Sequence, residues 1–279
     1  MLEPERLVAY ATLSEMRPRA WITLPGCNFE CKGCFAIAKR AFGRSMKPSE
    51  LVLLLREACA KYYGRTSLEE VMITGGEPFL DEEFLVSLVS SLREITSRIV
   101  IQTNASRMTP ELLDRLMDEG LSELVCDLKA WDDSIHRWYT GHSNHAVLNN
   151  IKYACGRMKI TINTLLIPGV VDVEEIEAMA RFLSQCDPKE LEYRINPFRA
   201  DLSPEPISRE PNDEEMKAAV RAAEKHLKGS VRSRSCLRES EGGLTTHWIT
   251  VFPDGRMERR GMENYRERNR TLLEEESEG

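Results

Sequence analysis

Short runs of β-prone apolar residues alternate with helical patterns along the first two hundred residues. The expected strands span residues 21–24, 71–74, 99–103, 124–128, 159–167 and 191–195. Strands separated by helices pair in parallel through right-handed crossovers. Six such units predict an α/β fold, a partial (β/α)6 TIM-like barrel, with an open doubly wound sheet as the alternative.

Polar residues at the start of the helical patterns predict where the helices begin. Ser49 is a candidate cap for a helix over 48–63. After the strand over 99–103, Thr109 is the candidate cap of another helix and Pro110 its first residue. His145 could cap a helix over 145–158, and Asn212 could cap one over 212–228.

The pattern changes after residue 196. Residues 200–211 contain three prolines and predict a loop before the helix that begins at Asn212. Pro253–Asp254–Gly255 is a turn signal between two β-prone runs, so 246–259 predicts a hairpin. We therefore expect a barrel domain over 1–199 and a C-terminal extension over 200–279: loop, helix, hairpin and acidic tail.

Composition limits the class of protein. Of 279 residues, 42% are hydrophobic and 30% charged, a balance that fills a core and excludes global disorder. No apolar signal segment opens the chain, and no apolar run approaches the roughly 18–20 residues that span a bilayer. We expect a soluble, cytoplasmic protein with reduced thiols and no membrane association. The net charge of −7 argues against nucleic acid as a partner, and the arginine-rich stretch 255–270 is most simply a solvated face.

The eight cysteines are unevenly spread. Cys27, Cys31 and Cys34 lie within eight positions just after the first strand, at the barrel end where active sites form. Three thiolates can hold three corners of a [4Fe–4S] cubane and leave one iron open. The alternative is zinc, with a fourth ligand drawn from the histidines: His136, His142, His145, His226 and His247. The other five cysteines stand alone and are expected to be packing residues: Cys59, Cys126, Cys155, Cys186 and Cys236.

A glycine pair follows the second strand, in Thr74-Gly75-Gly76-Glu77-Pro78. Adjacent glycines let the backbone approach a ligand closely and present its polar groups. Because the pair follows the very next strand after the cysteine triplet, both loops should lie at the same end of the barrel. The loop of Gly75, Gly76, Glu77 and Pro78 is therefore a candidate ligand-binding loop.

Together, the CxxxCxxC triplet and the GGEP loop resemble the radical S-adenosylmethionine superfamily. The resemblance implies that Cys27, Cys31 and Cys34 bind a [4Fe–4S] cluster whose open iron chelates S-adenosylmethionine. It implies that Gly75, Gly76 and Glu77 contact the methionine end of that cofactor. One-electron reduction would then give methionine and a 5′-deoxyadenosyl radical, which abstracts hydrogen from a substrate.

Later motifs narrow the resemblance. The segments Asp127-Leu128-Lys129, Thr140-Gly141, Ser143-Asn144-His145 and Leu165-Leu166-Ile167-Pro168-Gly169 are similar in order to the activating enzymes of glycyl radical enzymes, of the pyruvate formate-lyase activase type. The similarity covers residues 20 to 200. It implies a glycyl radical enzyme as partner and a flavodoxin or ferredoxin as electron donor.

Four polar residues at inner strand positions or strand ends are further candidates for cofactor contact: Asn104, Asp127, Lys129 and Asn163. A buried charge must be paired or bound to a ligand. Asp127 and Lys129 are two residues apart on one strand and share a face, so a mutual ion pair is the alternative for them.

The chain departs from the family pattern at three places. Gly33 stands before the third cysteine where an aromatic residue is common, Gln102 replaces an aspartate, and Phe198-Arg199 replaces a Tyr-His pair. Arg199, with Arg194 nearby, could bind a substrate carboxylate or phosphate, or could be a surface residue. His136 and His142 are expected at the surface or at caps. Three aromatic residues near them are expected to be packing residues: Trp131, Trp138 and Tyr139.

Three functions remain open. The first is activation of a glycyl radical enzyme. The second is the same radical chemistry on another peptide, a nucleotide or a small molecule. The third is a non-catalytic Fe–S or zinc binding module.

Overall fold

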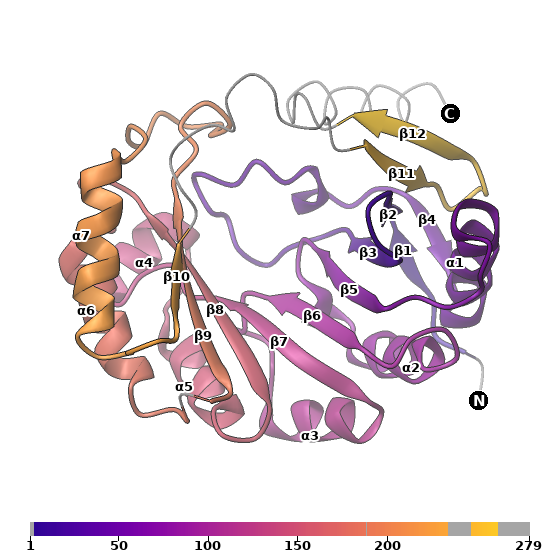
Figure 1. The fold of residues 1–279 in the computed structure, drawn as a ribbon, viewed down its shortest axis with the longest axis horizontal. Helices are drawn as coiled ribbons and strands as arrows, with labels where there is room; N and C mark the ends of the chain where they lie inside the picture. Colours follow the sequence, from indigo (N-terminus) through magenta and orange to yellow (C-terminus); the bar gives the residue numbers. More distant parts are fainter. Residues whose placement is uncertain (1–2, 188, 234–246, 262–279) are drawn as a thin grey trace.

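The computed structural model describes residues 3–187, 189–233 and 247–261. Six parallel strands form the centre of one curved ten-stranded sheet (Figure 1). They are β3 (Arg19–Leu24), β5 (Glu70–Gly75), β6 (Ile99–Thr103), β7 (Leu121–Asp127), β8 (Lys159–Leu166) and β9 (Leu191–Pro197). Each pairs with the next in parallel. The predicted partial (β/α)6 barrel is confirmed.

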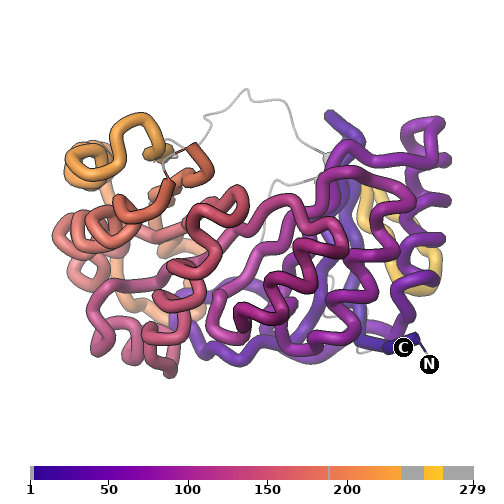
Figure 2. The backbone as a smooth tube through the Cα atoms, turned by 90° about the horizontal axis from the view of Figure 1, so that it is seen from below, coloured from indigo at the N-terminus to yellow at the C-terminus, as the bar shows by residue number. Residues whose placement is uncertain are grey.

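Six helices lie outside the curve of this sheet (Figures 1 and 2). They are α1 (Pro48–Tyr63), α2 (Glu82–Leu92), α3 (Pro110–Asp118), α4 (Asp133–Thr140), α5 (His145–Ala154) and α6 (Val173–Leu183). Their apolar residues and the outward-facing strand residues form one continuous buried core. Helix α4 was not predicted, because its eight residues are too few and too polar to give a clear periodic pattern. Within the described ranges, none of the helices has the length and apolar character needed to cross a bilayer.

The C-terminal segment joins both edges of the sheet. After α7 (Asp213–Glu224), β10 (Val231–Ser233) pairs in parallel with β9. The predicted hairpin forms as β11 (His247–Val251) and β12 (Met257–Gly261), and β11 pairs with β2 (Tyr10–Ser14). We propose residue 199 as the end of the barrel, with the extension completing the sheet on either side. The predicted acidic tail lies outside the described residues.

Three N-terminal strands were missed. Strand β2 pairs antiparallel with β3, and β1 (Arg6–Val8) pairs with β4 (Arg44–Met46) in a separate two-stranded sheet. No helix separates β1, β2 and β3, so these strands lie outside the strand–helix alternation on which the prediction relied. All five residues of β2 are buried, because β2 lies between β3 and β11.

Helix starts test the cap predictions. The Thr109 hydroxyl accepts the Leu112 N–H at 3.2 Å, and the Asn212 side chain accepts the Glu215 N–H at 2.9 Å, so both caps are confirmed. Ser49 is wrong: Pro48 is the first residue of α1, and Ser49 lies inside the helix. His145 is wrong too, because Asn144 precedes α5 as its cap position.

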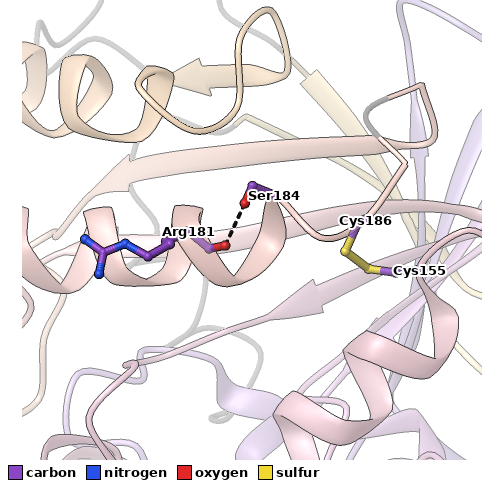
Figure 3. Close-up of a disulfide and its surroundings, with 4 residues drawn as sticks. All are labelled: Cys155, Arg181, Ser184 and Cys186. Carbon is purple, nitrogen blue, oxygen red and sulfur yellow. Dashed lines mark hydrogen bonds between the residues drawn. A yellow bond between two sulfur atoms is a disulfide. The ribbon is translucent and has the colours of Figure 1, made fainter.

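Two of the isolated cysteines are bonded to each other. Cys155 at the end of α5 and Cys186 after α6 form a disulfide with their Cα atoms 5.1 Å apart (Figure 3). Packing by reduced thiols is therefore wrong for these two, whereas Cys59 and Cys126 are buried free thiols as predicted. The two helices precede the neighbouring strands β8 and β9, so the topology, and no spacing in the sequence, brings these residues together. Cys236 lies outside the described residues.

We expect the disulfide to stabilise the folded protein. Replacing Cys155 and Cys186 together with serine should lower the free energy of unfolding by about 3 kcal/mol, because a crosslink closing a 31-residue separation restricts the unfolded chain. Urea denaturation measures the change. A thiol reductant should shift the wild-type midpoint and leave that of the double variant in place. An equal response of both proteins would contradict the crosslink.

Candidate active site

A cavity of about 860 Å³ runs through the barrel interior. At the carboxyl ends of the strands it is lined by Gly33, Phe35, Lys129, Asn163 and Phe198. At the amino ends it is lined by Arg19, Glu70, Arg98 and Glu123. One cavity therefore connects the loop of the cysteine triplet with the opposite end of the barrel.

The cysteine triplet lies on the loop after β3. Cys27, Cys31 and Cys34 are half-buried free thiols. Two backbone bonds fix the loop to the end of α4: the Glu30 N–H donates to the Thr140 carbonyl at 2.9 Å, and the Lys32 N–H donates to the Tyr139 carbonyl at 3.0 Å. The unfilled carbonyls at a helix end thus position the loop that carries the three sulfur atoms.

An aromatic wedge strengthens this attachment. Phe29, buried between the first two cysteines, stacks on His142 at 5.2 Å and meets His136 edge-on at 5.6 Å. His136 is fully buried, so the surface or capping role predicted for it is wrong, whereas His142 is exposed as predicted. Burial lowers the pKa of His136, and its Nδ1 lies 2.7 Å from the His142 carbonyl oxygen.

The three aromatic residues expected to pack are buried to different degrees. Tyr139 is buried in the core, whereas Trp131 and Trp138 are 38% and 49% exposed. Trp131 contacts the Phe182 ring, and the Lys32 ammonium lies over the Trp138 ring at 5.5 Å. Each indole therefore covers a surface neighbour.

The donor set fits a cubane better than a single ion. In the part of the chain that the structure describes, no three Cys, His, Asp or Glu side chains come close enough to hold one metal ion. A cubane binds each thiolate through a different iron, so its three sulfur atoms need not converge. Burial raises the pKa of Cys31 to about 11 and also raises that of Cys27. Cluster binding must therefore release protons from these thiols.

The glycine pair brings the second loop onto the first. A Cβ on Gly76 would lie 1.9 Å from the Gly26 carbonyl oxygen, and one on Gly75 would lie 2.2 Å from that of Leu24. The Gly76 N–H donates to the Leu24 carbonyl at 2.8 Å, and the Glu77 N–H donates to that of Gly26 at 2.7 Å. The close approach expected of these glycines is therefore made to the backbone that leads into Cys27.

Glu77 is the anchor of this second loop. Its buried carboxylate accepts the Thr103 hydroxyl at 2.7 Å, the Asn104 N–H at 2.7 Å and the Phe79 N–H at 3.0 Å. Burial raises its pKa, and these hydrogen bonds work in the opposite direction. With both oxygens engaged, we propose that the Glu77 side chain positions the loop rather than touching a cofactor.

Arg6 holds the same loop from the other side and was missed in the sequence. This buried guanidinium donates to the Glu77 carbonyl at 2.8 Å and the Pro78 carbonyl at 2.5 Å. Burial lowers its pKa, opposed by the carboxylates of Asp81 and Glu77. The available signal was a single basic residue among the first sixteen, which is too common a feature to single out.

Replacing Glu77 with glutamine should lower the free energy of unfolding by about 2–4 kcal/mol. The NH2 group of glutamine cannot accept a hydrogen bond, so at least one of the donors that now bond to the carboxylate would lose its acceptor. Chemical denaturation checks this value. Glu83→Gln is the matched control: Glu83 is exposed and bonds only to Arg115 in the described residues, so its change should stay within about 0.5 kcal/mol. Equal effects would contradict the anchoring role.

Asn104 lies beside the cysteine loop, as its candidate role requires. Its amide donates to the Asn28 side-chain oxygen at 3.0 Å and lies 4.0 Å from the Cys27 sulfur. The next residue, Ala105, has a φ of 59°, a left-handed conformation that costs a non-glycine residue about 1 kcal/mol. The chain turns sharply here and directs Asn104 toward the triplet.

Asp127, Lys129 and Asn163 all line the cavity. The Lys129 ammonium lies 3.2 Å from the Asp127 carboxylate, so the alternative of a mutual ion pair is realised inside the cavity. Burial alone would lower the pKa of Lys129, but Asp127 and Cys31 raise it further than burial lowers it. This lysine therefore keeps its positive charge next to the cysteine loop.

The departures from the family pattern have structural counterparts. A Cβ on Gly33 would lie 2.8 Å from both the Phe198 ring and the Tyr139 hydroxyl, so aromatic residues from elsewhere already fill this space. Gln102 lines the cavity. Arg199 forms two hydrogen bonds of 2.7 and 2.8 Å with Asp201, so it is bound to an internal carboxylate.

Charged residues at the amino ends of the strands form the floor of the cavity, and they were not foreseen. Arg98 bonds to Glu70 and Glu123, each at 2.7 Å. Arg19 and Lys159 flank these two glutamates, at 3.7 and 2.9 Å. The charges alternate in sign from β3 to β8, and both glutamates are almost fully buried.

Comparison with known proteins agrees with this arrangement. A model of the radical SAM superfamily matches residues 21–183. A Methanocaldococcus jannaschii protein, named provisionally as a glycyl-radical enzyme activating enzyme, is 33% identical over 198 residues, 69% of this chain and 71% of that protein. The isethionate sulfite-lyase activating enzyme of Oleidesulfovibrio alaskensis is 29% identical over 181 residues, 62% of this chain and 55% of that protein. The chain spans about half the length of several other relatives.

Solved structures share the fold. A domain of the pyruvate-formate lyase-activating enzyme from Bacteroides vulgatus ATCC 8482 matches with a TM-score of 0.51 and 23% identity, covering 60% of this chain and 99% of that domain. SuiB of Streptococcus suis, bound to S-adenosylmethionine, matches with a TM-score of 0.59 and 16% identity, covering 78% of this chain and 52% of that protein. At these identities the likeness concerns the fold alone.

Proposed function

Because the chain belongs to the radical SAM superfamily, we propose that it activates a partner protein by removing a hydrogen atom from one of its glycine residues. The chain is an enzyme of this superfamily, and a [4Fe–4S] cluster and S-adenosylmethionine are its cofactors. When bound, the two supply one-electron cleavage of S-adenosylmethionine and a carbon-centred radical that abstracts hydrogen. The glycine substrate is the part that we propose.

We assign the cofactor roles from the contacts of each side chain. Cys27, Cys31 and Cys34 hold the cluster on a loop fixed by α4. Asn104 lies beside Cys27 and is placed to contact the cofactor there. Asp127 and Lys129 form an ion pair in the cavity, and Asn163 lies on the next strand. We assign Asp127 to the ammonium and Lys129 to the carboxylate of the methionine part of S-adenosylmethionine.

One observation supports the proposal of a glycine residue as the substrate. Residues from two segments that resemble the activases, Lys129 after β7 and Leu165 near the end of β8, line the same cavity as Gly33 and Phe35 beside the third cysteine. That cavity reaches the carboxyl ends of the strands, where a loop of a partner protein could enter. Several relatives named as activating enzymes support the same substrate class.

The test is radical transfer to a glycyl radical enzyme encoded beside this chain. The reduced protein, S-adenosylmethionine and the partner are mixed without oxygen, and electron paramagnetic resonance is recorded. We expect a glycyl doublet that collapses to a singlet when the partner glycine is deuterated at Cα. No glycyl signal, together with intact S-adenosylmethionine cleavage, would rule out this substrate.

The charged cavity floor favours a second candidate, a small polar molecule as substrate. Arg19, Arg98 and Glu70 lie at the far end of the cavity and could bind such a molecule. Deuterium transferred from a labelled metabolite into 5′-deoxyadenosine, without transfer from any protein, would establish this alternative.

A further inference from the structure

Basic residues are concentrated in the segment that follows the cysteine triplet. Between residues 31 and 49 the sequence has five basic residues and no acidic one, although the whole chain carries a net charge of −7. Such segregation raises the local positive potential on an otherwise acidic protein. The segment therefore differs in charge from its surroundings.

The segment is built onto the two loops of the candidate active site. The carbonyl of Ala38, in the short helix η1 (Ile37–Lys39), accepts the Gly26 N–H at 2.8 Å and also lies against Gly76. Further along, β4 pairs with β1, where Val8 lies opposite Arg44. The basic residues thus have a fixed place next to the cysteine loop.

Apolar residues hold the segment down. Ile37 and Phe42 pack against a small cluster formed by Ala9, Tyr10 and Phe252, and Phe252 follows β11 of the C-terminal hairpin. The hairpin therefore contributes Phe252 to the cluster on which this segment packs. This contact gives the C-terminal extension a role in shaping the surface beside the cysteines.

Three of the five basic side chains are open to a partner. Lys39, Arg40 and Arg44 are exposed and make no ion pair within the described residues. The other two are compensated: Lys32 pairs with Glu205 at 3.2 Å, and Lys47 lies 3.8 Å from Glu5. We call Lys39, Arg40 and Arg44 the basic surface.

We propose that the basic surface docks an acidic electron-donor protein that carries a low-potential flavin or iron–sulfur centre. The inference rests on the proposed function, since only a redox-active cluster needs a donor. One electron passes from the reduced donor, which is oxidised, to the cluster, which is reduced, and no bond forms or breaks. A few exposed charges suit the small, transient interface of electron transfer and give strong dependence on ionic strength.

Charge reversal tests the surface. In the variant Lys39→Glu/Arg40→Glu/Arg44→Glu, the second-order rate of cluster reduction by a reduced flavodoxin should fall at least about tenfold at low salt. The difference should shrink as ionic strength rises, because the Debye length falls from about 30 Å at 0.01 M to about 10 Å at 0.1 M. Reduction by dithionite, a small anion, is followed in parallel and should change less than about threefold.

The matched control reverses the same amount of charge elsewhere. Lys61, Lys152 and Lys228 are exposed residues at or after the carboxyl ends of helices, at the barrel end opposite the cysteine loop. The variant Lys61→Glu/Lys152→Glu/Lys228→Glu should keep the flavodoxin rate within about twofold of wild type. The glutamine triple variant of the basic surface should give an intermediate rate.

Three results would overturn the proposal. One is an unchanged rate of cluster reduction by flavodoxin in the charge-reversal variant. If that variant instead loses binding to nucleic acid, the basic surface binds nucleic acid and not an electron donor. Another is an equal loss with flavodoxin and dithionite, which would place the effect on the cluster itself. The third is loss of dithionite-driven glycyl radical formation, which would make the basic surface a dock for the substrate protein. Because the reduction assay needs no glycyl partner, its result is independent of whether the substrate assignment holds.

Discussion

The Cys31→Ala protein should lose S-adenosylmethionine cleavage by more than about 100-fold. Even a residue that only supports a metal ligand costs about 10–100-fold when it is removed, and Cys31 is proposed as a direct ligand. Its thiol is half-buried, free of any disulfide, and on the same loop as Cys27 and Cys34. Iron and sulfide per chain after anaerobic reconstitution, and the rate of 5′-deoxyadenosine formation, are the two measurements.

A cysteine of a different kind provides the control. Cys59 is a buried free thiol in α1, away from the cavity. Cys59→Ala should keep the iron content and the cleavage rate, with a loss of about 1–2 kcal/mol in stability from the smaller side chain. Full iron content and activity in the Cys31 variant would contradict the assignment of the cysteine triplet as the cluster ligands.

The Gly76→Ala protein should show the second-largest effect, a loss of about 100-fold in cleavage rate. The added Cβ would lie 1.9 Å from the Gly26 carbonyl oxygen, which is a backbone atom. Because the Cβ is bonded directly to the backbone of residue 76, no side-chain rotation can relieve this clash. The two loops must therefore separate, and a misplacement of about 1 Å at a reacting centre costs about 100-fold. Stability should fall as well, by about 1–3 kcal/mol.

Gly156→Ala separates crowding from backbone strain. Gly156 has a φ of +76° with nothing within 4 Å of an added Cβ, so its substitution adds strain without a clash. It should cost about 1 kcal/mol in stability and leave the cleavage rate unchanged. Similar cleavage rates in the two variants would show that the loop contact at Gly76 is unimportant.

Local patterns were sufficient for much of the fold. Strand 99–103 and helix 48–63 were predicted with the observed bounds, because each is a periodic run bounded by a turn or a proline. The order of strands and helices then decided the parallel sheet. The close backbone approach at Gly75 and Gly76 could be predicted, because residues with a Cβ are excluded from such contacts.

Features that depend on distant pairing were not predictable. The bond between Cys155 and Cys186 requires β8 and β9 to be neighbours, and the role of Arg6 requires its strand to cross the loop at Glu77. The same holds for Arg98, whose two glutamate partners come from different strands. His136 is buried against Phe29, and no pattern in the sequence pairs these two residues.

The proposed chemistry requires a cubane that leaves one iron for S-adenosylmethionine. The most direct measurement is electron paramagnetic resonance of the anaerobically reconstituted, one-electron-reduced protein with and without S-adenosylmethionine. We expect a spin-½ signal from one [4Fe–4S] cluster per chain, with g values that shift when S-adenosylmethionine is added. A protein that takes up zinc in place of iron, or a cluster signal that S-adenosylmethionine leaves unchanged, would contradict it.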